Sequence, residues 1–343
     1  MSRSRTERPP APRDRPSAVP PGRARLIALV RSAAVAAPMA VGAGTGHLGP
    51  GLACSFGAYL TLAAFSSLTS RPPVADLLAG GVLLSLAAAA GAASAGIAAA
   101  VVAGAALAAA LQGVSEVAGG PLRMAAAMAV LAFLLAGVDL AQGVSWWAYA
   151  AQFAAGTLWQ ALVITATGRT VTGPGPAASL RRTRGRLRDA TPFAATLACT
   201  GALATGTAWL IPLSHAVWLA SSALRVAKPS REAVHTRAKD RVLGTLGGGV
   251  IAALLLTPRV PVLLLALVVA VTLCAMQLVT AARYGWWTLC LTVVALVFGM
   301  EHGMGDWELA AERIALTVGG VALALVMLAA GGRLTAAVRR RTG

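Results

Sequence analysis

The sequence predicts an all-α, polytopic integral membrane protein of about twelve transmembrane helices, arranged as two six-helix tandem repeats. The chain of 343 residues is 57% apolar and 12% charged, whereas soluble domains are about 45 to 50% apolar and about 25% charged. Its apolar residues gather in runs of about the 20 residues that a helical span needs. Its net charge of +17 lies mainly in the segments between those runs, as the positive-inside rule expects, so nucleic acid is not an expected partner.

Residues 1–25 are rich in Arg and Pro and bury too little apolar surface to fold, so we expect a disordered basic tail. The first transmembrane half comprises residues 26–167, with spans expected at 26–46, 49–68, 75–94, 96–114, 122–139 and 146–167. A basic cytoplasmic linker at 168–189 leads into the second half, residues 190–331. Its spans are expected at 190–211, 212–226, 241–257, 260–280, 283–300 and 308–331. A basic cytoplasmic tail, 332–343, ends the chain.

The positions of the charges predict the orientation. With the N-terminus in the cytoplasm, the tail, the linker, the segment 225–241 and the C-terminal arginines share one side, leaving Arg259 and Arg313 on the other. The opposite side receives acidic residues, namely Asp139, Glu301, Asp306, Glu308 and Glu312. Both termini are therefore expected on the cytoplasmic side.

The two halves have the pattern of a repeat. A shift of 164 residues places Asp76 on Asp240, Gly80 on Gly244 and Gly156 on Gly320. Six spans per half return the chain to the same side, which is typical of the parallel repeats of transporters. Substrate sites in such proteins are expected between the halves, near the middle of the membrane.

One set of residues in the second half forms a motif. His215 and Trp218 stand in one apolar run, a basic segment follows, and Arg241 with Gly244 and Thr245 opens the next run. Further on, Tyr284 opens a span, and the last span carries Arg313, Gly319 and Gly320. With these residues the chain resembles the fusaric acid resistance protein-like (FUSC) family of bacterial membrane proteins.

The resemblance implies a multi-pass transport protein of the bacterial inner (cytoplasmic) membrane. The function that we expect from it is the efflux of small, aromatic organic acid anions. The alternative is a structural or partner-binding membrane protein that transports nothing. The residues that we expect to contact a substrate are Arg313, His215, Trp218, Arg237, Arg241, Thr245 and Tyr284. Expected partners are the bilayer with its anionic lipids and small organic anions, and a homo-oligomer is an open alternative.

The basic segment allows two interpretations. Arg225, Arg231, Arg237 and Arg241 could set the topology and attract anionic lipid heads, at about 1 kcal/mol for each basic residue near the surface. They could instead collect organic anions at the cytoplasmic mouth, because guanidinium groups bind carboxylates bidentately. Interfacial anchoring is the alternative for Trp218. Glu312 and Arg313 lie just inside the last span, where ionisable groups usually face a partner or a wet cavity.

Glycines mark two helix faces that can approach a neighbour closely, and we assign them to helix packing: Gly244, Gly247, Gly248, Gly319 and Gly320. A helix break that binds an anion is the alternative at the first three. The sequence has no phosphate-binding loop, nucleophile elbow or metal motif. We therefore expect no enzyme activity, no cofactor and no metal.

Overall fold

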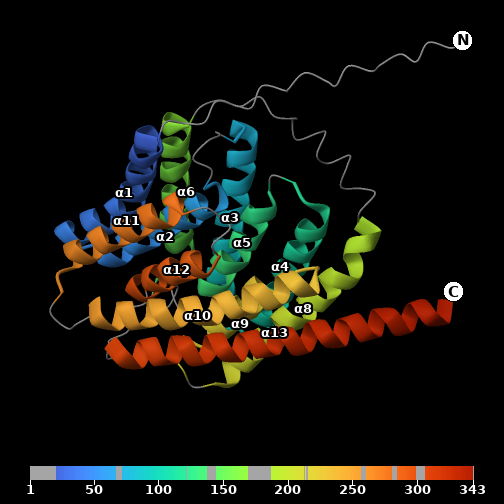
Figure 1. Cartoon of the computed structure of the whole chain (residues 1–343). Helices are drawn as coiled ribbons and strands as arrows, with labels where there is room; N and C mark the ends of the chain where they lie inside the picture. The colour runs from blue at the N-terminus through green and yellow to red at the C-terminus, as the bar shows by residue number, and fades with distance from the viewer. Residues whose placement is uncertain are drawn as a thin grey trace, which may run out of the picture.

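A computed structural model describes residues 21–66, 72–120, 122–136, 144–168, 187–211, 213, 215–255, 260–279, 284–298 and 306–342. Within these ranges the regular secondary structure is all helix, with no strand (Figure 1). The first half contains α1 (Pro21–Thr45), α2 (Leu48–Ala64), α3 (Val74–Ser94), α4 (Ala98–Ala118), α5 (Arg123–Leu135) and α6 (Trp146–Thr167). The second half contains α8 (Leu187–Leu210), α9 (Val217–Val226), α10 (Arg231–Leu255), α11 (Val262–Leu278), α12 (Tyr284–Phe298) and α13 (Asp306–Thr342).

Five of these helices are long and apolar enough to cross a membrane, by length and composition: α1, α3, α4, α8 and α13. The other expected spans stay predictions, except for the one expected at 212–226, which differs from its prediction. Helix α9 has 10 residues and rises about 15 Å, half of the hydrocarbon thickness. The span expected at 212–226 is therefore a half-length helix, which ends shortly before Pro229 because the residue preceding a proline disfavours helical geometry.

Two helices begin earlier than expected. Helix α1 begins at Pro21, so residues 21–25 of the stretch expected to be disordered are helical, and proline is well suited to the first helical position. Helix α10 begins at Arg231 rather than at 241. Ser230 precedes it and accepts a hydrogen bond from the backbone N–H of Ala233 through its hydroxyl, at 3.3 Å. This N-cap starts the helix ten residues before the apolar run.

Helices in corresponding positions of the two halves make corresponding contacts. Helix α2 packs on α6 as α9 packs on α13, and α3 packs on α5 as α10 packs on α12. The halves are joined by two equivalent pairs, α4 with α8 and α1 with α11. Figure 1 shows α10 and α13 side by side, running in opposite directions along one side of the molecule.

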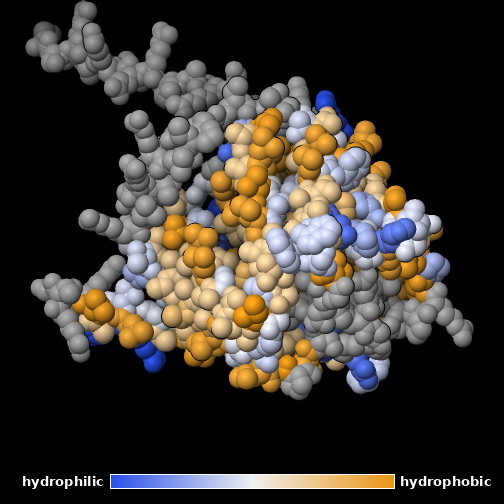
Figure 2. Space-filling model, turned by 180° about the vertical axis from the view of Figure 1, so that it is seen from behind, coloured by the Kyte–Doolittle hydropathy of each residue, from blue (hydrophilic) through white to orange (hydrophobic). Residues whose placement is uncertain are grey.

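The core runs through both halves, whereas large apolar side chains also cover the outside. Leu60 and Phe153 of the first half belong to the same buried cluster as Val217 and Leu296 of the second. On the outside, Leu107 and Val326 are each 64% exposed, and apolar residues cover much of the described part of the face in Figure 2. Soluble monomers rarely expose so much apolar surface, so lipid is the medium that this surface fits.

A polar contact network fastens α1 to both halves. Arg31 is fully buried and donates to the Thr167 hydroxyl at 2.9 Å, at the C-terminal end of α6. Gln277 of α11 donates to the carbonyl oxygen of Ala28 at 3.1 Å and to the hydroxyl of Ser32 at 2.6 Å. A cation near a helix C-terminus is favourable, so Arg31 is a structural residue.

Candidate functional site

A small cavity lies between the two halves. The first half contributes Phe56, Tyr59, Leu131 and Leu135 to its wall. The second half contributes the remaining lining, which is His215, Trp218, Ser221, Arg225, Arg241, Leu291, Ala295, Phe298 and Arg313. The cavity measures about 60 Å³, which is room for a few water molecules. Its wall is therefore mostly apolar and aromatic, and three arginines add positive charge to it.

Helix α9 brings three of these residues to the cavity, Trp218, Ser221 and Arg225, and His215 lies just before it. All ten of its residues are buried, so it lies inside the protein rather than on its surface. Its N-terminal end is held by Glu312 of α13, whose carboxylate accepts the backbone N–H of His215 at 2.9 Å. A helix N-terminus favours a negative charge at this place, and the contact fixes the position of His215 and of the turn that follows.

Two arginines at the cavity are buried without a carboxylate. Arg225 is 7% and Arg241 is 1% exposed, and neither forms an ion pair with any acidic residue in the described ranges. Arg225 donates to the Met128 sulfur at 3.4 Å and lies 5.1 Å from the centre of the Trp287 ring. Arg241 reaches the Ser222 hydroxyl at 3.5 Å. A thioether, an indole face and a distant hydroxyl are weak compensation for two desolvated charges.

A second group of polar residues stands at another part of the wall. The guanidinium of Arg313 lies 4.4 Å from the centre of the Trp218 ring. The same ring stacks on the His215 imidazole at 4.4 Å, and His215 Nδ1 lies 3.9 Å from the Glu312 carboxylate. Trp218 is 3% exposed. Interfacial anchoring is therefore the wrong interpretation for this tryptophan, which separates a histidine from an arginine inside the protein.

Aromatic rings form the opposite part of the wall. Phe56 contacts Phe298 edge-on, with ring centres 6.1 Å apart, and Tyr59 lies 6.3 Å from the same ring. These contacts join α2 of the first half to α12 of the second. A shift of 164 residues places the cationic positions 241 and 313 on Leu77 and Tyr149, so the charges of the cavity come from one half only.

The expected binding residues do not all reach the cavity. Arg313, His215, Trp218 and Arg241 line it. Arg237, one turn before Arg241 on α10, is half-buried and stacks over the Tyr284 ring at 4.5 Å. Thr245 is 1% exposed, one turn after Arg241, and is not part of the lining. Arg237 and Arg241 thus follow one face of α10 from the surface inward, whereas Arg231 and Lys239 of the same helix stay exposed.

The basic segment 225–241 is a helix for most of its length, not a solvated loop. Residues 227–230 alone separate α9 from α10 in this segment. Arg231 stays exposed, whereas Arg225 and Arg241 are buried. Arg, Glu, Lys and Ala are good helix formers, so this stretch extends α10 toward the N-terminus. Collection of anions at a cytoplasmic mouth stays a prediction for all four arginines.

Three of the five glycines assigned to packing lie against a neighbouring backbone. A Cβ atom at Gly244 would lie 2.5 Å from the Gly285 carbonyl oxygen, and one at Gly248 would lie 2.5 Å from that of Leu289. At Gly320 the corresponding distance to the Leu219 carbonyl oxygen is 2.3 Å. Gly247 and Gly319 meet only side-chain carbon atoms, at 3.2 and 3.7 Å. Helix α10 therefore approaches α12, and α13 approaches α9, at distances that admit only glycine.

The tryptophan pairs at span starts differ from each other. Trp146 and Trp147 are 53% and 64% exposed at the start of α6, where belt anchoring applies. Trp286 is 45% exposed, but Trp287 is half-buried beneath Arg225. Trp287 therefore contacts Arg225, a residue of the cavity wall, without lining the cavity itself.

Sequence reasoning missed several residues of the site. Phe56, Tyr59 and Phe298 lie in apolar runs and carry no local signal that distinguishes them from core residues. Lys228 forms an ion pair with Glu116, 112 residues away. Burial lowers the pKa of Lys228 from its usual value, and the carboxylate of Glu116 opposes this shift. Arg225 was noticed as a basic residue but not as a buried one.

Comparisons with known proteins agree with the motif in the second half. The family model described as fusaric acid resistance protein-like matches residues 203–327. This range includes α9 to α12 and every cavity residue that the second half supplies. Neither the curated proteins nor the solved structures contain a match to the chain. Residues 203–327 are therefore similar to the fusaric acid resistance protein-like family, in a chain with five described helices long and apolar enough to cross a membrane.

Proposed function

We propose that this protein transports small organic anions across the membrane, and that the cavity between its halves is where they bind. The observation that carries the proposal is the pair Arg225 and Arg241, buried at the cavity with no acidic partner in the described ranges. Removing a guanidinium from water is expensive unless a negative charge accompanies it. A carboxylate ligand supplies that charge and matches the guanidinium geometry.

The rest of the wall favours an amphipathic ligand. Phe56, Tyr59 and Phe298 present apolar and aromatic surface next to the cationic side. An aromatic acid has one charged end and one flat apolar end, so it suits both sides of this cavity. Ring-to-ring contacts of this kind are worth about 0.5 to 1.5 kcal/mol beyond the buried area.

The corresponding helix contacts of the two halves support a tandem repeat with the site at its centre. The direction proposed is export, with both termini on the cytoplasmic side of a bacterial inner membrane. A cytoplasm-negative potential favours outward movement of an anion by about 2.3 kcal/mol per charge per 100 mV. Export of a monoanion down this potential needs no coupling ion.

The test is uptake of labelled benzoate into proteoliposomes with an imposed potassium diffusion potential. Saturable flux that grows when the receiving compartment is positive is the expected result. The matched variant is Arg241→Gln, which leaves a polar amide at this position and removes the charge. Absence of flux from folded wild-type protein would favour the alternative of a structural membrane protein.

A further inference from the structure

The cavity must enlarge before an organic acid can enter it. Its volume of about 60 Å³ accommodates a few water molecules and no aromatic ring with a carboxylate. Trp218 and Arg225, which stand near the two ends of α9, both belong to its lining. A movement of this short buried helix would therefore change the cavity more than the movement of any single side chain.

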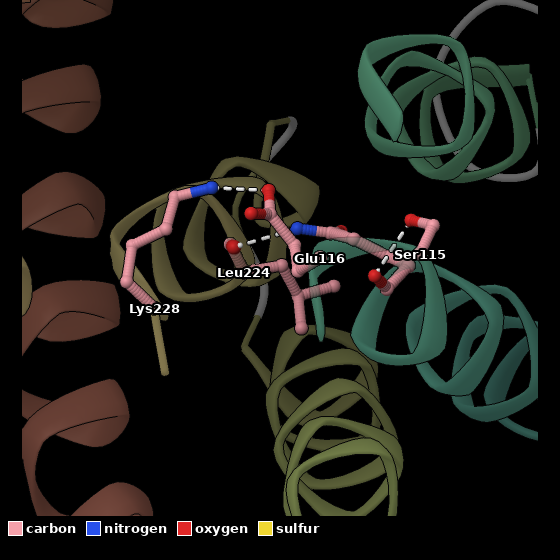
Figure 3. A network of polar contacts seen from close by, with 5 residues as sticks. Ser115, Glu116, Leu224 and Lys228 are labelled. Carbon is pink, nitrogen blue, oxygen red and sulfur yellow. Dashed lines mark hydrogen bonds and ion pairs between the residues drawn. The ribbon is translucent and has the colours of Figure 1, made fainter. Parts of the chain in front are cut away.

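The C-terminal end of α9 is held by α4 of the first half. The Gln112 side chain donates to the carbonyl oxygen of Leu224 at 3.1 Å, directly before Arg225 in the chain. Two residues after α9, Lys228 forms an ion pair with Glu116. Figure 3 shows both contacts side by side, with the Lys228 amine directed at the Glu116 carboxylate.

Helix α4 is a firm support for these contacts. It packs along α8, and a Cβ atom at Gly113 would lie 2.7 Å from the Cα atom of Ala194. The two backbones are therefore in contact next to Gln112. The Ser115 hydroxyl donates to the Gln112 carbonyl oxygen within its own helix, at 2.8 Å, and not to α9 (Figure 3).

The ion pair is placed among cations. The side chains of Lys228 and Glu116 are 14% and 6% exposed, so water screens them little. Arg237 and Arg225 both lie close enough to act on the charge of Lys228. If Glu116 were neutral, three cations would repel one another where α9 ends, and this repulsion would drive the end of α9 away from α10.

We propose that Glu116 and Gln112 form a latch that keeps the cavity closed, and that its release opens the cavity on the side of Lys228 and Arg237. An organic anion that reaches Lys228 and Arg237 competes with Glu116 for the same charges and so promotes its own entry. This inference rests on the proposed function for the identity of the anion. The opening itself is a property of the protein alone.

The experiment measures access to the cavity. Ser221→Cys places a thiol in the cavity wall of full-length protein whose native cysteines at 54, 199, 274 and 290 are replaced by serine. Labelling of this thiol by a charged maleimide is followed with and without Glu116→Gln. Loss of a hydrogen bond to a charged group corresponds to about tenfold in an opening equilibrium, and we expect an increase of about that size in the labelling rate.

Two further variants serve as controls. Ser115→Ala removes a hydroxyl from the same helix end without touching α9, and we expect the parent labelling rate. The exchange Glu116→Lys with Lys228→Glu restores opposite charges, and it should bring labelling back close to the parent rate. An unchanged rate in folded Glu116→Gln protein would overturn the latch, and so would equal effects of Ser115→Ala and Glu116→Gln.

A variant that fails to fold does not end the test. Gln112→Leu keeps the size of the side chain and removes only the donor to Leu224, so faster labelling is again expected and an unchanged rate again overturns the proposal. Labelling needs no substrate, so the two proposals can fail separately. Fast labelling of the Glu116→Gln protein without benzoate flux in the wild type would refute the proposed function and support the latch. Benzoate flux in the wild type with an unchanged labelling rate in Glu116→Gln would support the proposed function and refute the latch.

Discussion

The guanidinium of Arg313 lies 4.4 Å from the centre of the Trp218 ring, in a place where both residues are 3% exposed. Desolvated cation–π pairs contribute about 2 kcal/mol or more. We therefore expect Trp218→Leu to be less stable than Trp218→Phe, which keeps a ring in place, by roughly 1 to 2 kcal/mol. Thermal unfolding in detergent measures this difference. Equal melting temperatures for the two variants would show that the ring face does not stabilise Arg313.

Substitutions of Arg313 test its role in transport. Arg313→Ala should abolish benzoate flux in proteoliposomes, and Arg313→Lys should transport poorly while it inserts and folds, because lysine keeps the charge but loses the planar fork. Size-exclusion chromatography checks the folding of both. Wild-type rates in both variants would mean that Arg313 takes no part in transport.

The close contact between α10 and α12 can be tested by comparing substitutions at two adjacent glycines of α10. A Cβ atom at Gly248 would meet the Leu289 carbonyl oxygen at 2.5 Å, whereas one at Gly247 would meet the end of the Leu289 side chain at 3.2 Å. Alanine raises helix propensity by about 1 kcal/mol at either position. We expect Gly247→Ala to preserve or raise the melting temperature and Gly248→Ala to lower it. The same shift for both would contradict close backbone contact.

The proposed orientation is tested by labelling from each side of the membrane. Thr236 on α10 and Trp307 at the start of α13 are both exposed and lie on opposite sides in the expected topology. Thr236→Cys should react with an impermeant maleimide only from the cytoplasm, and Trp307→Cys only from outside. Reaction of position 236 in intact cells would reverse the proposed direction of access.

The positions of many helices were predictable because a helix surrounded by lipid needs a continuous run of apolar residues. The run that contains α8 and the run that contains α11 were placed almost residue by residue. The length and the burial of α9 were not predictable. A mainly apolar run of 15 residues has the same composition whether it lies in lipid or inside a protein. The two prolines at 212 and 229 were the available sign of a short helix.

The site was predictable only in part, for the same physical reason. His215, Trp218, Arg241 and Arg313 stood out because polar and ionisable residues in apolar runs are costly. The burial of Arg225 depends on contacts with Met128 of α5 and Trp287 of α12. The pairing of Lys228 with Glu116 depends on the end of α4 lying beside the end of α9. Such contacts arise from tertiary structure, and a single sequence carries no local record of them.

Equilibrium binding of benzoate to the purified protein tests most directly whether Arg225 and Arg241 bind an organic anion. Trp287 lies against Arg225, and Trp218 lies against Arg313 in the cavity wall, so tryptophan fluorescence can follow the titration. We predict saturable binding that is weaker by about tenfold or more in Arg241→Gln, since a charge-assisted hydrogen bond contributes about 1.5 to 3 kcal/mol. Arg333→Gln, which removes an exposed arginine of α13, should bind as the wild type does. Equal affinity in Arg241→Gln and wild type, or no binding by either, would contradict the account.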